Sequence, residues 1–197
     1  VSDGGEGITE ALVTATQGTV HQLKVADPLN RNIKSSYGLL SDNKTTVIEM
    51  SKASGILLLN EKERNPLETT TFGTGELIKH ALDKGFRKFI MGIGGSSTND
   101  CGTSMAQALG IRFFRKDKTE ITEKMCGKLL KEVHDISFDK IHPAIKESSF
   151  QIACDVDNPL LGEKGCAKIY AAQKGANKEA IEILETGMEH FITVAEK

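Results

Sequence analysis

The chain has 197 residues, of which 39% are hydrophobic and 26% are charged, and its formal net charge is −2. This balance is typical of a globular protein and excludes a disordered one. With no basic excess and no polybasic run, we expect neither nucleic acid nor a membrane among its partners. No apolar stretch approaches the roughly 20 residues that a membrane-spanning helix needs.

The four cysteines show no spacing typical of a zinc site, and none belongs to a Cys-x-x-Cys pair. We therefore expect free thiols in a reducing cytosol and a cytoplasmic protein. The chain starts at Val1 with nothing that resembles a signal peptide, and residues 3–7 already look like a functional loop. Because a domain rarely begins on such a loop, we expect a fragment of a longer protein.

Apolar periodicity predicts alternating helices and strands. In chain order, the predicted elements are a helix over 8–16, a strand over 19–25, a hairpin of 35–40 and 45–50, a helix over 74–84, a strand over 87–93, a helix over 103–109, a strand over 111–114, helices near 122–131 and 139–147, a strand over 150–153 and a helix over 178–194. This order predicts an α/β fold with a mixed sheet and flanking helices. In such sheets ligands gather at the carboxyl ends of strands.

The most informative segment is the loop 92–102, Gly-Ile-Gly-Gly-Ser-Ser-Thr-Asn-Asp-Cys-Gly, which joins a predicted strand to a predicted helix. Its backbone N–H groups, its hydroxyls and the helix N-terminus together suit an anion such as phosphate. The loop lacks the Gly-Lys-Ser/Thr ending of a Walker loop. A tight turn followed by a capped helix explains the same residues.

Four further segments carry polar groups beside glycine or proline, and each has a structural alternative. In 3–7, Asp3 and Glu6 could hold a cation or cap the next helix. In 72–76, Thr74 could cap a helix whose glycine amides face an anion, or the segment could be a plain helix cap. Asp155 and Asp157 point the same way in an extended segment and suit Mg²⁺, although an Asx-turn is equally compatible. Lys174 could pair with phosphate or lie in solvent. Anion loops, carboxylates and a lysine are together the parts of phosphoryl transfer.

The order and spacing of five motifs closely resemble the bacterial class I glycerate kinases. These motifs are Ser-Asp-Gly-Gly-Glu-Gly at 2–7, Asn-Pro-Leu at 65–67 through Thr-Gly-Glu-Leu-Ile at 74–78, the loop 92–100, Cys-Asp-Val-Asp-Asn-Pro-Leu-Leu-Gly at 154–162, and Tyr170 through Gln-Lys-Gly-Ala at 173–176. The resemblance implies transfer of the ATP γ-phosphate to D-glycerate, usually giving 2-phosphoglycerate, with Mg²⁺. Cys101 stands where glycine is frequent in the family, which is a small departure.

Members of that family are much longer, with a Rossmann-like domain built from both chain ends and a second α/β domain inserted between them. The resemblance therefore implies that residues 1–197 form the inserted domain, with the Rossmann-like domain largely missing. The full-length parent would be the kinase, and the fragment alone would be inactive because its cleft is incomplete. The sequence leaves open whether the protein forms a homodimer.

The site roles are our own interpretation of the matching residues. The predicted catalytic residues are Asp3, Asp100 and Lys174; the predicted substrate- or phosphate-binding residues are Glu6, Thr74, Gly94, Gly95, Ser96, Ser97, Thr98 and Asn99; and the predicted metal ligands are Asp155 and Asp157. Asp3 or Asp100 would accept the proton of the glycerate hydroxyl. A rival hypothesis is an isolated non-catalytic domain that binds a ligand or docks onto another domain. A third and weaker hypothesis is another small-molecule kinase or a phosphatase, because that hypothesis does not account for the spacing of the five motifs.

Overall fold

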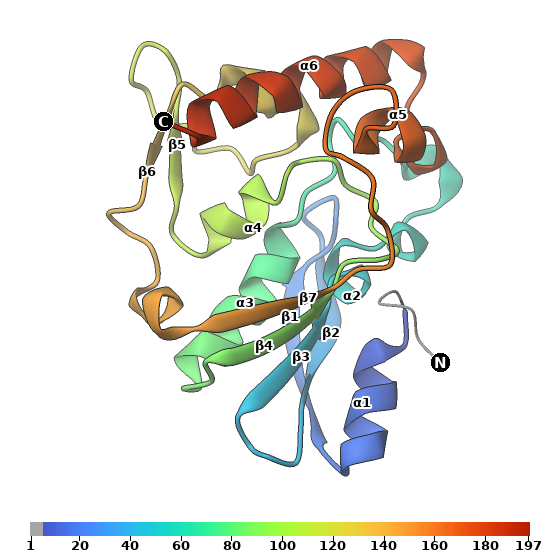
Figure 1. The fold of residues 1–197 in the computed structure, drawn as a ribbon, viewed down its shortest axis with the longest axis vertical. Helices are drawn as coiled ribbons and strands as arrows, with labels where there is room; N and C mark the ends of the chain where they lie inside the picture. Colours follow the sequence, from blue (N-terminus) through green and yellow to red (C-terminus); the bar gives the residue numbers. More distant parts are fainter. Residues whose placement is uncertain (1–5) are drawn as a thin grey trace.

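The computed structural model describes residues 6–197, and its centre is a five-stranded mixed sheet with strand order β1-β2-β3-β4-β7 (Figure 1). The strands are β1 (Thr19–Ala26), β2 (Asn32–Leu39), β3 (Thr45–Glu49), β4 (Lys88–Gly92) and β7 (Ser149–Ala153). The first three strands pair antiparallel, whereas β3, β4 and β7 pair parallel. The predicted α/β class and the predicted mixed sheet are confirmed.

Helices cover both faces of this sheet. The helices are α1 (Ile8–Thr16), α2 (Ser51–Ser54), α3 (Phe72–Asp83), α4 (Thr103–Ala108), α5 (Cys166–Tyr170) and α6 (Lys178–Ala195). A Cβ on Gly38 of β2 would lie 2.5 Å from Cγ2 of Val13, so α1 packs closely on that face. The neighbouring Tyr37 is fully buried in one core with Leu77 of α3. Because successive strand residues point to opposite faces, α1 and α3 lie on opposite sides of the sheet.

The three parallel strands end in register. Glu49 pairs with Gly92, and Gly92 pairs with Ala153, so the last residues of β3, β4 and β7 form one row. The amide of Met50 donates to the carbonyl of Gly92, which continues the pairing beyond β3. The loops that follow Gly92 and Ala153 therefore leave the sheet side by side, at the edge where ligands gather in α/β folds.

A second core lies above the sheet, under the long helix α6 (Figure 1). The Asn177 side chain accepts a 2.8 Å hydrogen bond from the amide of Ala180 and so caps α6. Leu184 and Met188, one turn apart, bury their side chains in this core. A small antiparallel ribbon of β5 (Arg112–Phe114) and β6 (Asp135–Ser137) borders it.

The strongly periodic elements follow the prediction, including the hairpin of β2 and β3, and the charged stretch between β5 and β7 does not. The helices predicted near 122–131 and 139–147 are short 3₁₀ segments, Gly127–Glu132 and Pro143–Glu147, and β6 was not predicted. Such short segments are stabilised by long-range packing and have little periodicity of their own. Within residues 6–197, no helix is both long and apolar enough to cross a membrane.

Candidate functional site

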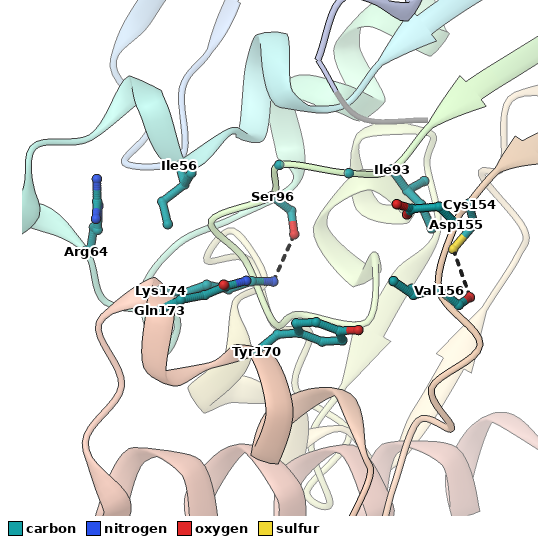
Figure 2. A pocket seen from close by; sticks show the side chains of 12 residues that line it. Ile56, Arg64, Ile93, Ser96, Cys154, Asp155, Val156, Tyr170, Gln173 and Lys174 are labelled. Carbon is teal, nitrogen blue, oxygen red and sulfur yellow. Dashed lines mark hydrogen bonds between the residues drawn. The ribbon is translucent and has the colours of Figure 1, made fainter. Parts of the chain in front are cut away.

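A cavity of about 570 Å³ opens where the loops after β4 and β7 leave the sheet (Figure 2). It is lined by Ile56, Arg64, Ile93, Gly94, Gly95, Ser96, Cys154, Asp155, Val156, Tyr170, Gln173 and Lys174. In the view of Figure 2, Ser96 and Lys174 lie between Arg64 on one side and Asp155 on the other. Three of the segments that were singled out from the sequence thus meet around one cavity. They are the loop 92–102, the segment 154–162 and the turn that carries Lys174.

The loop after β4 presents unpaired backbone amides to this cavity. Within the described part of the chain, the N–H groups of Gly94, Gly95 and Ser96 donate to no acceptor. The loop is fixed on either side, because the amide of Ile56 donates to the carbonyl of Gly95 and the amide of Ser97 donates to the carbonyl of Ser54. Gly95 has φ +70°, a left-handed conformation that favours glycine. Consecutive free amides in a turn form a concave site for an anion.

Lys174 supplies a buried cation beside these amides. Its side chain is 8% exposed, and its Nζ donates to Oγ of Ser96 at 2.8 Å and to the carbonyl of Thr98 at 2.7 Å. Burial lowers the pKa of Lys174 to about 8, against the opposing charge of Asp100. A desolvated ammonium group with two neutral acceptors is poised to receive an anion.

A second cavity, of about 330 Å³, shares Ile93, Ser96 and Lys174 with the first. The predicted binding residues of the loop divide between the two cavities. Gly94, Gly95 and Ser96 line the first, whereas Ser96, Thr98 and Asn99 line the second. The Oδ1 atom of Asn99 is buried without a hydrogen-bond partner among the described residues, so an unsatisfied polar group lies in the wall of the second cavity.

Ser97 was predicted to bind phosphate, and the structure places it elsewhere. Its side chain is buried, and its Oγ donates to the carbonyl of Ser54 at 3.0 Å. Its own carbonyl accepts from Oγ1 of Thr69. Ser97 therefore fastens the loop to its neighbours and lines neither cavity.

Asp100 was predicted to act as a proton acceptor, and its surroundings fit a structural role instead. Its side chain is 1% exposed. Its Oδ2 accepts from the amide and from Oγ1 of Thr71, at 2.9 and 2.7 Å, and its Oδ1 accepts from the amide of Gly102. Burial raises the pKa of Asp100, and these hydrogen bonds oppose the rise. With its lone pairs engaged, the carboxylate ties the loop to the start of α3.

The helix cap predicted at Thr74 is wrong. The N-cap residue of α3 is Thr71, and Thr74 lies inside the helix, fully buried, with its Oγ1 2.8 Å from Oγ of Ser54. The flanking glycines allow close packing: a Cβ on Gly73 would lie 1.9 Å from the carbonyl oxygen of Ala26, and one on Gly75 would lie 2.5 Å from that of Met105. The glycines therefore serve helix packing, and the buried Thr74 lines neither of the two cavities.

The predicted segment 3–7 reaches the loop after β4 through Glu6. A Cβ on Gly95 would lie 3.5 Å from Oε1 of Glu6. The start of α1 is held by the buried carboxylate of Glu49, which accepts hydrogen bonds from the amides of Gly7 and Thr9. Asp3, the other predicted proton acceptor, lies outside the described residues.

The predicted metal ligands are only partly brought to the cavity. Asp155 lines it, whereas Asp157, two residues later, is exposed and is absent from its lining. Among residues 6–197, no group of three or more His, Cys, Asp or Glu side chains could hold a metal ion. A single cavity carboxylate is compatible with Mg²⁺ only where phosphate oxygens and water supply the other ligands.

Comparison with known proteins identifies the family. The model of the glycerate kinase family matches residues 1–197, the whole chain. The chain belongs to the glycerate kinase family. The site assembled above from the loop after β4, the loop after β7 and Lys174 is therefore a site in a glycerate kinase fold, and the family resemblance of the five motifs is confirmed.

Similar proteins carry the same family name. A glycerate kinase of Halalkalibacterium halodurans is 47% identical over the whole chain, and a glycerate 2-kinase of Escherichia coli is 42% identical over the whole chain. A solved structure assigned as glycerate kinase 2 of Salmonella typhimurium LT2 has a TM-score of 0.93 and 40% identity over 98% of the chain. The chain spans about half the length of each of these relatives, 51% in all three cases.

Three residues of this glycerate kinase site were not expected from the sequence. Arg64 has no role among the predicted site residues, yet it lines the cavity. Ser54 and Glu49 are buried polar residues that fasten the loop after β4 and the start of α1. An arginine before Asn-Pro has no periodic or motif signal, so only the folded arrangement shows its position.

Proposed function

We propose that the complete protein transfers the γ-phosphate of ATP to D-glycerate and produces 2-phosphoglycerate. The observation that carries the proposal is the buried Nζ of Lys174, held by Ser96 and the carbonyl of Thr98 beside free loop amides. An ammonium group and N–H donors in one cavity suit a transferring phosphoryl group, where charge neutralisation and positioning supply most of the catalysis. The names of similar proteins support glycerate as the acceptor.

Each group at the cavity has a defined task in this proposal. The amides of Gly94, Gly95 and Ser96 bind phosphoryl oxygens, and Lys174 neutralises their charge. A hydroxyl oxygen of glycerate bonds to the γ-phosphorus, the bond from that phosphorus to the ADP oxygen breaks, and the hydroxyl proton passes to a carboxylate. Because Asp100 is engaged in the loop, Asp3 is the remaining predicted acceptor of that proton.

Mg²⁺ is proposed to bind through Asp155, the carboxylate that lines the cavity. When it is bound together with phosphate oxygens, Mg²⁺ supplies charge neutralisation for the transferring group. Asp157 stays a predicted ligand, although its side chain lies outside the cavity lining. The assignment of residues 1–197 as the inserted domain of a two-domain kinase likewise stays a proposal.

The test is an assay of ADP release by the complete protein, with D-glycerate, ATP and Mg²⁺, followed by phosphorus NMR of the product. We expect ADP release that depends on D-glycerate and a signal of 2-phosphoglycerate. No glycerate-dependent ADP release would contradict the proposal, and a signal of 3-phosphoglycerate would contradict its regiochemistry alone.

A second candidate, a non-catalytic ligand-binding or docking domain, is favoured by one observation. Both carboxylate oxygens of Asp100, a predicted proton acceptor, accept hydrogen bonds from Thr71 and Gly102 and so serve the structure of the loop. Calorimetry of the 197-residue chain with D-glycerate, and then with ATP and Mg²⁺, separates the two functions. Binding without turnover, in this chain and in the complete protein, would support a binding domain.

A further inference from the structure

Arg64 is a cation of the cavity that has no counterion in the described part of the chain. Its guanidinium forms no ion pair within residues 6–197, and its Nε is buried without a hydrogen-bond partner. Other arginines of the chain, such as Arg112 and Arg115, each engage two carboxylates. Because Arg64 lines the cavity and its guanidinium donates to no described residue, an anionic ligand in the cavity meets a cation that is not already engaged.

The carboxylate next to Arg64 in the chain is already engaged. Glu63 accepts from Nη1 of Arg31 at 2.7 Å and from the amide of Asn60 at 3.1 Å, in the cap of the short 3₁₀ turn that precedes Arg64. Glu63 is thus held away from Arg64 by two other donors. The acceptor that Arg64 lacks is not provided by its neighbour in sequence.

The position of Arg64 is fixed against the turn that carries Lys174. Gly175 has φ +97°, and a Cβ on it would lie 2.1 Å from the carbonyl oxygen of Arg64. The backbones at Arg64 and at the residue after Lys174 are therefore in direct contact. Both cations belong to one rigid wall of the cavity, so their spacing is set by the fold.

The charges around the cavity define an orientation for a ligand. Figure 2 shows Arg64 beside Ile56, with Ser96 and Lys174 next, and Asp155 on the far side. An anionic group is attracted to the Arg64 end and repelled from Asp155. Between the two cations the side chain of Ile56 offers an apolar contact, which suits a short carbon chain.

We propose that Arg64 binds the carboxylate of the hydroxy-acid substrate and so sets the specificity of the site for acids over neutral polyols. This inference rests on the proposed function. The planar guanidinium matches a carboxylate with two parallel hydrogen bonds, which an ammonium group does not reproduce. A carboxylate at Arg64 leaves the hydroxyl groups of the same short chain on the side of Ser96 and Lys174.

The test compares Arg64→Gln and Arg64→Lys with Lys62→Gln in the complete protein. Lys62 is an exposed residue of the 3₁₀ turn that ends at Arg64, and it lines neither of the two cavities described above, so it is matched in charge and location. Steady-state kinetics are measured with D-glycerate and with its neutral amide, and glycerate binding is measured by calorimetry without ATP. Thermal unfolding of each variant reports on folding.

We expect Arg64→Gln to lower kcat/KM for D-glycerate by about 100-fold, the effect of removing one partner of a desolvated charge pair. It should leave kcat/KM for the amide and KM for ATP within about threefold of wild type, the range expected for lost contacts unrelated to charge. Arg64→Lys should recover only part of the loss, and Lys62→Gln should match wild type.

Three results would overturn the inference. The first is unchanged glycerate binding in Arg64→Gln, and the second is a rise in KM for ATP alone, which would place a polyphosphate at Arg64. The third is a wild-type protein that does not distinguish glycerate from its amide.

If wild type binds glycerate through Arg64 but transfers no phosphate to it, only the proposed function fails. If wild type transfers phosphate and Arg64→Gln behaves identically, only this inference fails.

Discussion

The Nζ of Lys174 donates a 2.8 Å hydrogen bond to Oγ of Ser96, although 78 positions separate the two residues in the chain. The same Nζ donates to the carbonyl of Thr98, so one lysine joins the turn before α6 to the loop after β4. A bond of this kind both positions the loop and brings a cation beside its free amides.

Lys174→Met tests whether this cation serves function rather than folding. We expect kcat of the complete protein to fall at least about 100-fold, the usual loss when one charge-stabilising donor is removed. Thermal stability should change little, because the variant loses two hydrogen bonds but no longer buries a charge. Lys34→Met, at an exposed position of β2, is the control. Unfolding of the Lys174 variant at room temperature would show that the lysine is structural.

The lowered pKa of Lys174 predicts a pH dependence. The pKa falls from 10.5 to about 8 on burial, so the cation is lost from the folded protein as pH rises through about 8. Affinity for anionic substrates should therefore decline above about pH 8, and Lys174→Arg, which stays charged, should remove that decline. Measurement of KM between pH 6.5 and 9.5 in both proteins checks this. A parallel decline in both would assign the titration to another group.

The lowered pKa of Lys174 also makes the stability of the folded protein depend on pH, and stability rises with pH where substrate affinity falls. Since the folded state disfavours the charged lysine, the cost of burial is fully present below pH 8 and fades as pH approaches 10.5, with an upper limit of roughly 3 kcal/mol. Wild type should therefore gain unfolding free energy relative to Lys174→Met between pH 7 and pH 10, because only wild type loses the cost of burying a charge. Denaturant titrations at the two pH values measure it, and a constant difference would contradict the buried charge.

Asp100→Asn separates a structural carboxylate from a catalytic one. An asparagine side chain has one acceptor oxygen, so it cannot accept both from Thr71, as Oδ2 does, and from the amide of Gly102, as Oδ1 does, and a donor is left unsatisfied in the interior. We expect a loss of about 1–3 kcal/mol in unfolding free energy. Activity at temperatures well below unfolding should fall far less than the roughly 100-fold or more that removal of a general base causes. An inactive variant of unchanged stability would restore Asp100 as a base.

Gly73→Ala tests the packing role of the glycines at the start of α3. A Cβ there would overlap the carbonyl oxygen of Ala26 at 1.9 Å, so the backbone of β1 or α3 must shift. We expect destabilisation of about 1–3 kcal/mol, in spite of the higher helix propensity of alanine. Lys84→Ala, at the exposed C-cap of α3, should stay within about 0.5 kcal/mol of wild type. Equal melting temperatures of the two variants would contradict the packing role.

The location of the site could be predicted from sequence because it depends on local rules. Gly94, Ser96 and Asp155 follow predicted strands, and parallel strands bring their carboxyl ends together. The roles of Asp100, Ser97 and Thr74 could not be read in this way. A polar residue in a glycine-rich segment has the same pattern whether its side chain binds a ligand or a second loop, and the partners Thr71 and Ser54 lie 20 to 43 positions away.

Cys154 provides a reporter for occupancy of the cavity. It is the exposed thiol among the four free cysteines, and it lines the cavity beside Asp155. Burial raises the pKa of Cys101 to about 12 and that of Cys126 to about 11, so these thiols carry little reactive thiolate at neutral pH. We therefore expect iodoacetamide at pH 7.5 to modify Cys154 first, as mapped by peptide mass spectrometry.

A ligand in the cavity should slow that reaction, because it covers the thiol, and should leave the slow reaction of the other cysteines unchanged. A Cys154→Ser protein, which lacks the fast phase, is the control. Faster labelling of Cys126 than of Cys154 would contradict the burial that the structure gives the two residues.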